Sequence, residues 1–318
     1  MQFAGSVEIV DVTLRDGLQS LERVYPLEVK LEILQRLVAA GLRRIEFTSF
    51  VRPEVVPQLA DAEALAAALP ASHDCRFRAL IANRQGIERA VAAGVTEVVA
   101  LITASETYNQ MNQNMSIERN IEVIKSIARV ADAEGIHVVA AVGMTMFCPY
   151  EGEIPLERVL WIVKSLADAG IDEYYIATSA GLDGPRRVYE LARRLRNDFP
   201  ELKLGIHLHN TNGMGLANAL AAMDAGVTTF EGALCGIGGG IRFPKASGNH
   251  GNIALEDLVN MFEEIGASTG IDLGALVQLS REVAEMLALP VASYAASGGT
   301  KAQARCAAQR ARRGVVSG

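Results

Sequence analysis

The stretch Gly-Ile-His-Leu-His-Asn, residues 205–210, has the pattern of a β-strand that ends in His-x-His. Alternate side chains of a strand share a face, so His207 and His209 point to one side while Ile206 and Leu208 point to the other. Two imidazoles roughly 7 Å apart along a strand can bind one divalent metal ion if further ligands join them. Taken alone, the pair also fits two histidines that are hydrogen-bonded in a polar crevice.

Short apolar runs alternate with segments of helical periodicity on both sides of this strand. Glycine closes several of the helical segments, as expected at a helix C-terminus, at Gly41, Gly94, Gly170 and Gly226. Eight strand–helix units predict a (β/α)8 TIM barrel. An open doubly wound sheet is the alternative, but no Gly-x-Gly-x-x-Gly follows the first strand. The expected strands are Val7–Val12, Arg44–Phe47, Cys75–Ile81, Thr96–Ile102, His137–Met144, Glu173–Ala177, Lys203–His209 and Thr228–Leu234.

Residues 254–288 read as two more helices, so we expect one barrel domain over residues 1–290 that includes extra C-terminal helices. We expect an exposed apolar face near Leu273–Leu289, where a dimer contact would lie. Residues 291–318 form a basic tail, with lysine and arginine but no acid after residue 300. We expect this tail to be a solvated, flexible and frayed end, and the alternative is a contact to a phosphate or to CoA.

The composition narrows the class of protein. The 318 residues are 50% hydrophobic but only 5% aromatic, as expected for a parallel α/β core. The net charge of −7 does not indicate nucleic-acid binding. Four cysteines without Cys-x-x-Cys spacing suggest reduced thiols. With neither an apparent signal peptide nor an apolar run of membrane-spanning length, we expect a cytoplasmic protein without a membrane partner.

Polar side chains recur where the predicted strands end, and in a TIM barrel those ends form the active-site face. One such residue could belong to an ordinary loop, but a set of them at one rim predicts a functional site. The set contains Arg15 and Asp16 after strand one, Glu46, Thr48 and Ser49 at strand two, Thr178 and Ser179 after strand six, both histidines, a glycine-rich loop at residues 236–240, and Asn249 and Asn252.

Asp16, the two histidines and one asparagine carbonyl would give a mixed oxygen and nitrogen ligand set with a charge of −1. Such a set suits Mg²⁺ or Mn²⁺ in octahedral geometry, with two positions left for adjacent substrate oxygens. It differs from a closed structural zinc site, which uses thiolates. We therefore expect a metal that acts as a Lewis acid.

In four separated motifs, which follow one another in the same order, the chain resembles the metal-dependent TIM-barrel lyases and synthases. This group includes hydroxymethylglutaryl-CoA lyase, isopropylmalate synthase and the pyruvate carboxylase carboxyltransferase. The resemblance covers roughly residues 6–265 and is most specific for hydroxymethylglutaryl-CoA lyase. The motifs are Asp-Val-Thr-Leu-Arg-Asp-Gly-Leu-Gln at 11–19, Ile-Glu-Phe-Thr-Ser-Phe-Val-Arg-Pro at 45–53, His-Leu-His-Asn-Thr at 207–211 and Gly-Asn-Ile-Ala-Leu-Glu-Asp-Leu at 251–258.

The resemblance implies Asp16, His207, His209 and Asn252 as metal ligands, with Asn249 as the rival of Asn252. It implies that Arg15 stabilises a developing enolate oxygen, which is compatible with a salt bridge between Arg15 and Glu46. Glu46 and Gln19 would orient Arg15 or the substrate, and either His209 or a metal-bound water would transfer protons. Ser49, Thr178, Ser179 and Arg242 are further candidates for substrate binding. The resemblance also implies a homo-oligomer, either a dimer or a tetramer.

The chain departs from the lyase pattern in its loops. Gly240 stands where the lyase has a catalytic cysteine, and Cys235, five residues earlier, reads as a small buried residue. Thr178-Ser179 replaces an Asp-Thr pair. Arg242 and Lys245 could hold a carboxylate or a CoA phosphate in place of the lost groups.

The leading hypothesis is a carbon–carbon lyase that needs Mg²⁺ or Mn²⁺. It would cleave a 3-hydroxy-3-methylglutaryl-CoA-like acyl-CoA by retro-aldol (retro-Claisen-type) chemistry to acetyl-CoA and a keto acid. A synthase that condenses an acyl-CoA with a 2-oxoacid, or a 2-oxoacid aldolase, is the second hypothesis. The third hypothesis is a metal-binding barrel without catalysis, which the missing loop cysteine suggests.

Overall fold

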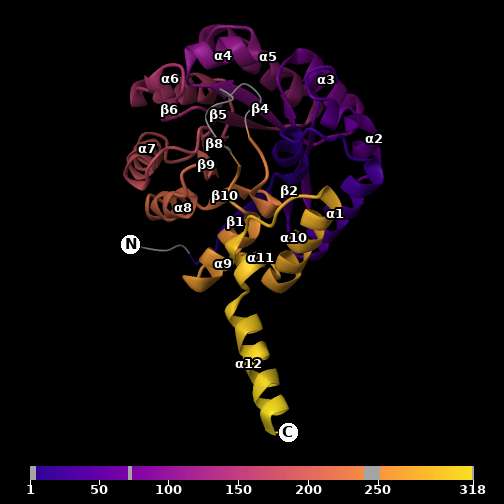
Figure 1. The fold of residues 1–318 in the computed structure, drawn as a ribbon. Coiled ribbons are helices and arrows are strands. Elements are labelled where there is room, and N and C mark those ends of the chain that lie inside the picture. Colours follow the sequence, from indigo (N-terminus) through magenta and orange to yellow (C-terminus); the bar gives the residue numbers. More distant parts are fainter. Residues whose placement is uncertain (1–4, 71–73, 240–250, 317–318) are drawn as a thin grey trace.

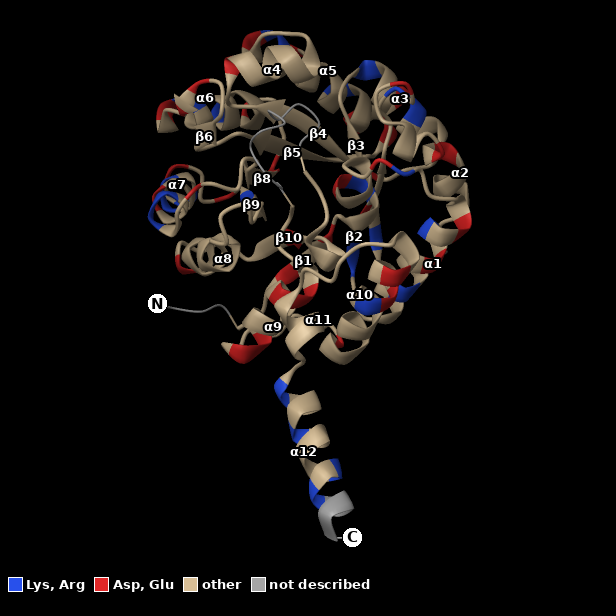
Figure 2. Cartoon of the chain, in the orientation of Figure 1, with Lys and Arg blue, Asp and Glu red and all other residues tan. Residues whose placement is uncertain are grey.

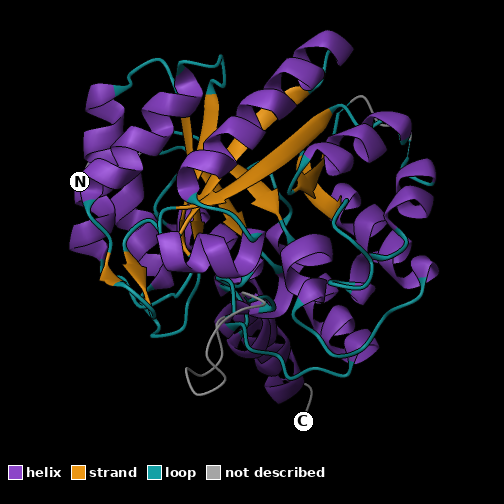
Figure 3. Ribbon diagram, turned by 90° about the horizontal axis from the view of Figure 1, so that it is seen from above, coloured by secondary structure: helices purple, strands orange, loops and turns teal. Residues whose placement is uncertain are grey.

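The computed structural model describes residues 5–70, 74–239 and 251–316. Eight parallel strands close into a barrel, in which β1 pairs with β2 on one side and with β10 on the other. A ring of helices surrounds the strands (Figure 1; Figure 3). The barrel strands are β1 (Glu8–Asp11), β2 (Arg44–Ser49), β3 (Arg76–Ile81), β4 (Glu97–Thr103), β5 (His137–Gly143), β8 (Glu173–Thr178), β9 (Lys203–Leu208) and β10 (Thr229–Gly232).

These strands confirm the predicted TIM barrel, and each lies within one or two residues of its expected bounds at either end. A two-stranded antiparallel sheet, β6 (Phe147–Cys148) with β7 (Gly152–Glu153), lies between β5 and the next helix. The helices are α1 (Leu27–Ala39), α2 (Ala62–Ala67), α3 (Arg84–Ala92), α4 (Glu106–Gln113), α5 (Ile117–Glu134), α6 (Leu156–Ala167), α7 (Pro185–Asp198), α8 (Gly215–Asp224), α9 (Leu255–Glu264), α10 (Leu273–Leu287), α11 (Tyr294–Gly298) and α12 (Lys301–Val316).

Local sequence signals explain where several helices begin and end. The Ser116 hydroxyl accepts a hydrogen bond from the Arg119 amide and confirms the predicted N-cap of α5. Gly94 and Gly226, both at positive φ, follow α3 and α8 as expected of C-terminal glycines. Residues 13–17, expected as a loop, form instead a short π-helix, η1 (Thr13–Gly17), which is buried along its whole length. The described residues also form two 3-10 turns, η2 (Pro57–Leu59) and η3 (Leu234–Gly236).

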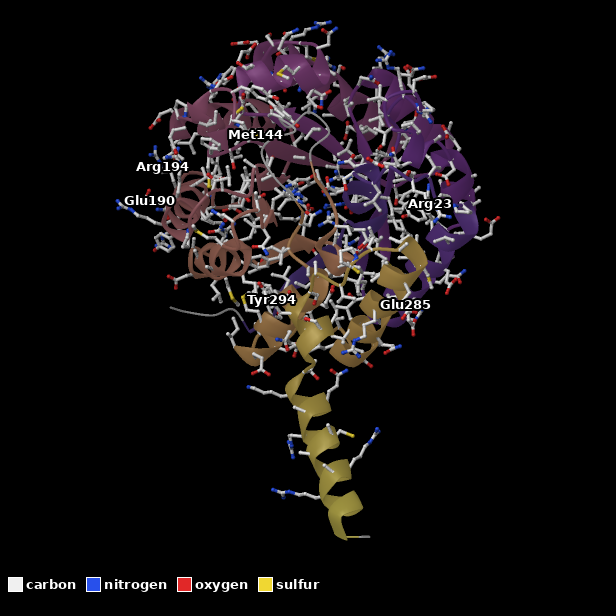
Figure 4. The ribbon with its side chains drawn as sticks, viewed as in Figure 1. Arg23, Met144, Glu190, Arg194, Glu285 and Tyr294 are labelled. Carbon is white, nitrogen blue, oxygen red and sulfur yellow. The ribbon has the colours of Figure 1, made fainter. Side chains whose placement is uncertain are left out.

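The main core lies between the strands and the surrounding helices, where each helix buries one apolar face. In α5, for example, Ile121, Ile124 and Ile127 recur at helical spacing and are buried. Charged pairs lie on the outer surface, such as Arg194 with Asp198 on α7. Figure 4 labels Arg194. At the N-terminal end of the barrel, the buried Arg44 pairs with Glu97 and Glu173.

The interior of the barrel is divided into a charged part and an apolar part. Arg15, Glu46, Arg78 and Glu231 are all buried and belong to η1, β2, β3 and β10. The apolar part is a separate cluster on β3, β4, β5 and β8, with the buried members Leu80, Val99, Val139, Ala141 and Tyr175. The cavity described below touches both parts.

The C-terminal helices differ from expectation in two ways. The apolar side chains of α10, among them Leu276, Leu279 and Val283, are buried, so the exposed apolar face expected near Leu273–Leu289 is wrong. The reason is that α10 packs against α1 and α9. Of the tail beyond residue 290, expected to be frayed, residues 294–298 and 301–316 are helical.

Asp257 anchors the start of α11, since its carboxylate accepts hydrogen bonds from the Ser293 hydroxyl and the Ala295 amide. Tyr294, which Figure 4 labels where the chain leaves the barrel, is 78% exposed. From there α12 projects away from the barrel (Figure 1) and carries lysine and arginine without acidic residues (Figure 2). Among the described residues, none of the helices has the length and apolar character that a membrane span requires.

Candidate active site

Asp16, His207 and His209 converge at the C-terminal end of the barrel. One ligand atom from each lies within 4.8 Å of the other two, and all three residues are buried. Nε2 of His209 is 3.7 Å from Oδ2 of Asp16, and the two imidazole ring centres are 4.9 Å apart. The structure therefore brings together three of the predicted metal ligands, which come from η1, from the end of β9 and from the residue after it.

Asn252 joins this group from the other side. An isolated bridge pairs its backbone with His209, and its Nδ2 donates to Oδ2 of Asp16 and to the Ile237 carbonyl, at 2.8 Å each. Its Oδ1 is buried and has no hydrogen-bond partner among the described residues. A buried carbonyl oxygen without a partner is costly, and a cation would satisfy it. The donor set thus fits a divalent metal, while Asn249 lies outside the described residues.

Gly238 and Gly239 of the glycine-rich loop pack directly against these ligands. Gly238 has φ +137°, and a Cβ built on it would lie 2.0 Å from Nδ2 of Asn252 and 2.6 Å from Oδ2 of Asp16. The next residue, Gly239, donates its amide to Asp16 at 3.4 Å. Only glycine leaves Asp16 and Asn252 where they are. Gly240, Arg242 and Lys245, which the sequence marked in the same loop, lie outside the described residues.

Glu231 orients His207, and the sequence analysis did not find it. Its carboxylate lies 2.9 Å from Nδ1 of His207, so a proton on Nδ1 leaves Nε2 with a lone pair for a metal. Burial alone would raise the pKa of Glu231, but Arg78 and His207 lower it to about 2. The carboxylate therefore stays charged. The signal in the sequence was an acid inside a buried strand.

Arg15 is a buried cation held between two carboxylates. It donates from Nε to Glu46 and from Nη1 to Asp16. Burial by itself would lower the pKa of Arg15, but Glu46 and Asp16 raise it above the ordinary value. Arg15 in turn lowers the pKa of Asp16 against the opposing effect of burial. The expected salt bridge between Arg15 and Glu46 is confirmed, and Arg15 also lines the cavity.

Arg78 on β3, which was also not predicted as a site residue from the sequence, links Arg15 and its partner Glu46 to Glu231 and His207. Its Nη2 lies 2.8 Å from Oε2 of Glu46 and also contacts Glu231. A continuous line of ion pairs and hydrogen bonds thus runs from Arg15 through Glu46, Arg78 and Glu231 to His207. With every member buried, this line fixes the orientation of Arg15 and His207 relative to each other.

A cavity of about 150 Å³ opens above the three clustered ligands and is lined by Arg15, Asp16, His207 and His209 among others. Of the residues predicted to bind substrate, Gln19 and Ser179 line it. Gln19 donates to Asp16 at 2.8 Å, and the Ser179 hydroxyl accepts from the Met144 amide at 3.0 Å. Figure 4 labels Met144, which follows β5 and has a positive φ of 52°.

Two other predicted substrate residues lie outside the lining of the cavity. The Thr178 hydroxyl accepts from the His209 amide at 3.3 Å, and thereby supports the strand end that carries His209. Ser49 is buried at the end of β2. Cys235 is buried, as predicted, its Sγ lies 3.2 Å from the Ser280 carbonyl, and burial raises the pKa of its thiol to about 12.

The chain resembles known proteins over most of its length. The model of the HMGL-like family matches residues 6–283. The mitochondrial hydroxymethylglutaryl-CoA lyase of Arabidopsis thaliana is 36% identical over 290 residues, which are 91% of this chain but 61% of that protein. The (R)-citramalyl-CoA lyase of Chloroflexus aurantiacus is 36% identical over 304 residues, 92% of this chain and 95% of that protein.

Solved structures give the same result. An HMG-CoA lyase of Bacillus subtilis superposes with a TM-score of 0.89 at 31% identity, over 93% of this chain and 99% of that one. An HMG-CoA lyase of Acinetobacter baumannii, solved with coenzyme A and 3-methylmalate, has a TM-score of 0.89 at 35% identity, over 95% and 97% of the two chains. The chain therefore belongs to the HMGL-like family, and within it to the carbon–carbon lyases.

Proposed function

We propose that this chain cleaves 3-hydroxy-3-methylglutaryl-CoA, or a close analogue, to acetyl-CoA and a keto acid with the help of Mg²⁺ or Mn²⁺. The observation that carries the proposal is the convergence of Asp16, His207 and His209 within 4.8 Å, in a cavity that Arg15 also lines. The names of the relatives support the same reaction class.

The residues that would hold the metal are Asp16, His207, His209 and Asn252. When bound, the ion supplies Lewis-acid polarisation of the substrate's hydroxyl oxygen and of an adjacent oxygen. Glu231 keeps the His207 ring in the orientation that this binding needs, through its contact of 2.9 Å with Nδ1. Gly238 and Gly239 close one side of the ligand set.

Arg15 stabilises the charge that forms during cleavage. As the bond between C2 and C3 breaks, its electron pair moves onto the thioester as an enolate, and C3 becomes a ketone. The guanidinium is already fixed by Glu46 and Asp16, so it meets the developing negative charge without reorganising. Proton transfer to C2 of the enolate then gives acetyl-CoA.

We assign the transfer of the substrate's hydroxyl proton to His209, which lines the cavity beside Asp16. His209 thus has two assigned roles, as ligand and as proton carrier, and they separate experimentally. A variant such as His209→Asn that still binds Mn²⁺ but has lost turnover supports the proton-transfer role. Parallel loss of both supports the ligand role alone.

A product assay tests the proposed function. Metal-stripped protein is mixed with HMG-CoA, and acetyl-CoA and acetoacetate are measured before and after addition of Mg²⁺ or Mn²⁺. Product that forms only with metal supports the lyase. Condensation of acetyl-CoA with a 2-oxoacid, without cleavage, would support a synthase instead, and Mn²⁺ binding without turnover would support a non-catalytic barrel.

A citramalyl-CoA is the second candidate substrate, because the Chloroflexus relative is named for that activity. Both thioesters carry a hydroxyl and a methyl group on a tertiary carbon and release acetyl-CoA. They differ in the keto acid released, which is pyruvate from citramalyl-CoA. The same assay run with both thioesters separates the two candidates by kcat/KM.

A further inference from the structure

The cavity has two sides of opposite chemistry. Among the described residues that line it, all charged groups and both histidines come from η1 and the β9 end: Arg15, Asp16, His207 and His209. The rest of the described lining holds aliphatic side chains from the segment after β2 and from β3 and β4, and uncharged polar side chains that include Thr103, Asn112 and Gln113. These aliphatic residues, which we call the aliphatic wall, are Val51, Val55, Val56, Leu80 and Leu101.

The aliphatic wall is built into the barrel. Leu80 is buried and belongs to the apolar interior cluster, and Val51 and Leu101 pack against that cluster. Strand register supports this layer, because Leu80 pairs with Val99 on β4 and Leu101 pairs with Ala141 on β5. The parallel sheet itself therefore holds Leu80 and Leu101, which present a fixed apolar surface to the cavity. The three valines of the wall extend this surface from the segment after β2.

Tyr175 forms the border between the two sides. Its ring centre lies 6.0 Å from that of His207 and 5.3 Å from the Arg78 guanidinium carbon. Tyr175 also belongs to the apolar interior cluster, and its register partner on β5, Ala141, is a member of the same cluster. The uncharged Tyr175 phenol thus separates the charged network from the aliphatic wall.

The wall therefore selects the group that faces it. A carboxylate placed there would lose its hydration without meeting a described cation, which is strongly unfavourable. An alkyl group would instead exchange water for the valine and leucine side chains. The five aliphatic side chains of the wall come from three segments of the chain and together present more apolar surface than one methyl group can cover.

We propose that the aliphatic wall binds an alkyl substituent on the tertiary carbon of the substrate, and that substrates with alkyl groups longer than methyl are favoured. The proposal rests on the proposed lyase function and makes it more specific: the substrate class is a 3-hydroxy-3-alkyl acyl-CoA. The hydroxyl and carboxyl groups of the acyl chain then face the charged side. Val51, Val55, Val56, Leu80 and Leu101 are its specificity-determining residues.

The test is a homologous series of 3-hydroxy-3-alkylglutaryl-CoA thioesters with methyl, ethyl and propyl groups, assayed for acetyl-CoA release by the metal-loaded protein. Each added methylene is expected to raise kcat/KM about fourfold, which corresponds to roughly 0.8 kcal/mol. A kcat/KM for the ethyl and propyl thioesters that is equal to or below that for the methyl thioester would overturn the proposal. Failure to cleave any member, methyl included, would refute the lyase function as well.

Variants of the wall distinguish an effect of the space available to the alkyl group from general damage to the protein. Leu101→Phe reduces the space and is expected to reverse the ranking, so that the methyl thioester becomes the best of the three. Leu101→Met conserves volume and is expected to keep the parental ranking. Val55, which is 42% exposed, offers a second narrowing variant, Val55→Phe, with little risk to folding. An equal loss of kcat/KM for all three thioesters in both narrowing variants would overturn the proposed role of the wall.

Discussion

Replacement of Gly238 by alanine should strongly weaken metal binding while leaving the barrel folded. The Cβ of the new residue would lie 2.0 Å from Nδ2 of Asn252 and 2.6 Å from Oδ2 of Asp16, distances at which the side chains must move. Both are assigned ligands, and Asn252 is held there by two hydrogen bonds of 2.8 Å. The positive φ of Gly238 adds backbone strain of about 1–3 kcal/mol.

The size of the effect follows from what the alanine displaces. Loss of a residue that only supports a metal ligand typically weakens metal affinity about 10- to 100-fold. Gly238→Ala displaces two assigned ligands, so we expect Mn²⁺ to bind at least about 100-fold more weakly. Gly213→Ala is the matched control, because Gly213 also has a positive φ, +76°, but its Cβ would meet no atom within 4 Å.

The assay is a Mn²⁺ titration of the parent and both variants, followed by the electron paramagnetic resonance of free Mn²⁺. Thermal unfolding of the same samples shows whether the fold survives. Gly213→Ala should lose some stability but bind Mn²⁺ like the parent. If Gly238→Ala also bound Mn²⁺ with parental affinity, the assignment of Asp16 and Asn252 as ligands would be refuted.

Two further substitutions test the charged network, and two test buried carboxyl groups outside it. Arg15→Lys should lower kcat about 10²- to 10³-fold, since an ammonium cannot hold two partners as a guanidinium does. A kcat equal to that of the parent in steady-state kinetics would contradict this expectation. Glu231→Gln should weaken Mn²⁺ binding about 10- to 100-fold in the same titration, and unchanged affinity would remove Glu231 from the site. Glu173, whose pKa the His137 and Arg44 contacts lower to about 2 against the effect of burial, contributes stability above pH 4.5 that is lost as pH falls through 2. Glu173→Gln should therefore reduce the free energy of unfolding by about 3 kcal/mol at pH 7 but much less near pH 2, as measured by urea unfolding. Burial raises the pKa of Glu256 to about 7, so the parent loses stability as pH rises from 4.5 to 7. The stability of Glu256→Gln relative to the parent should consequently increase over that range, and a constant difference would show that the pKa is not raised.

Local patterns were sufficient for the barrel and for the centre of the site. Strand periodicity placed the eight strands, and the strand ends placed Asp16, His207 and His209 on one rim. These positions depend on chain direction and side-chain alternation, which a sequence shows directly. The bridge between Asn252 and His209 supports Asn252 over Asn249 as the proposed fourth ligand.

Contacts across the barrel could not be predicted in the same way. Arg78 meets Glu231 over a separation of 153 positions in the chain, and no local pattern pairs one inward-facing charge with another. The division of the interior into a charged and an apolar part has the same origin, because it depends on which strands lie opposite each other. The helical state of residues 301–316 was missed because a basic composition says more about exposure than about backbone conformation.

The most direct test of the central claim is turnover of HMG-CoA by the metal-stripped protein, before and after addition of Mg²⁺ or Mn²⁺, with the Arg15→Lys and His207→Ala variants measured alongside. The account predicts acetyl-CoA and acetoacetate from the parent only when metal is present, little product from Arg15→Lys, and none from His207→Ala. Equal turnover in the presence of a chelator, or full activity in either variant, would contradict it.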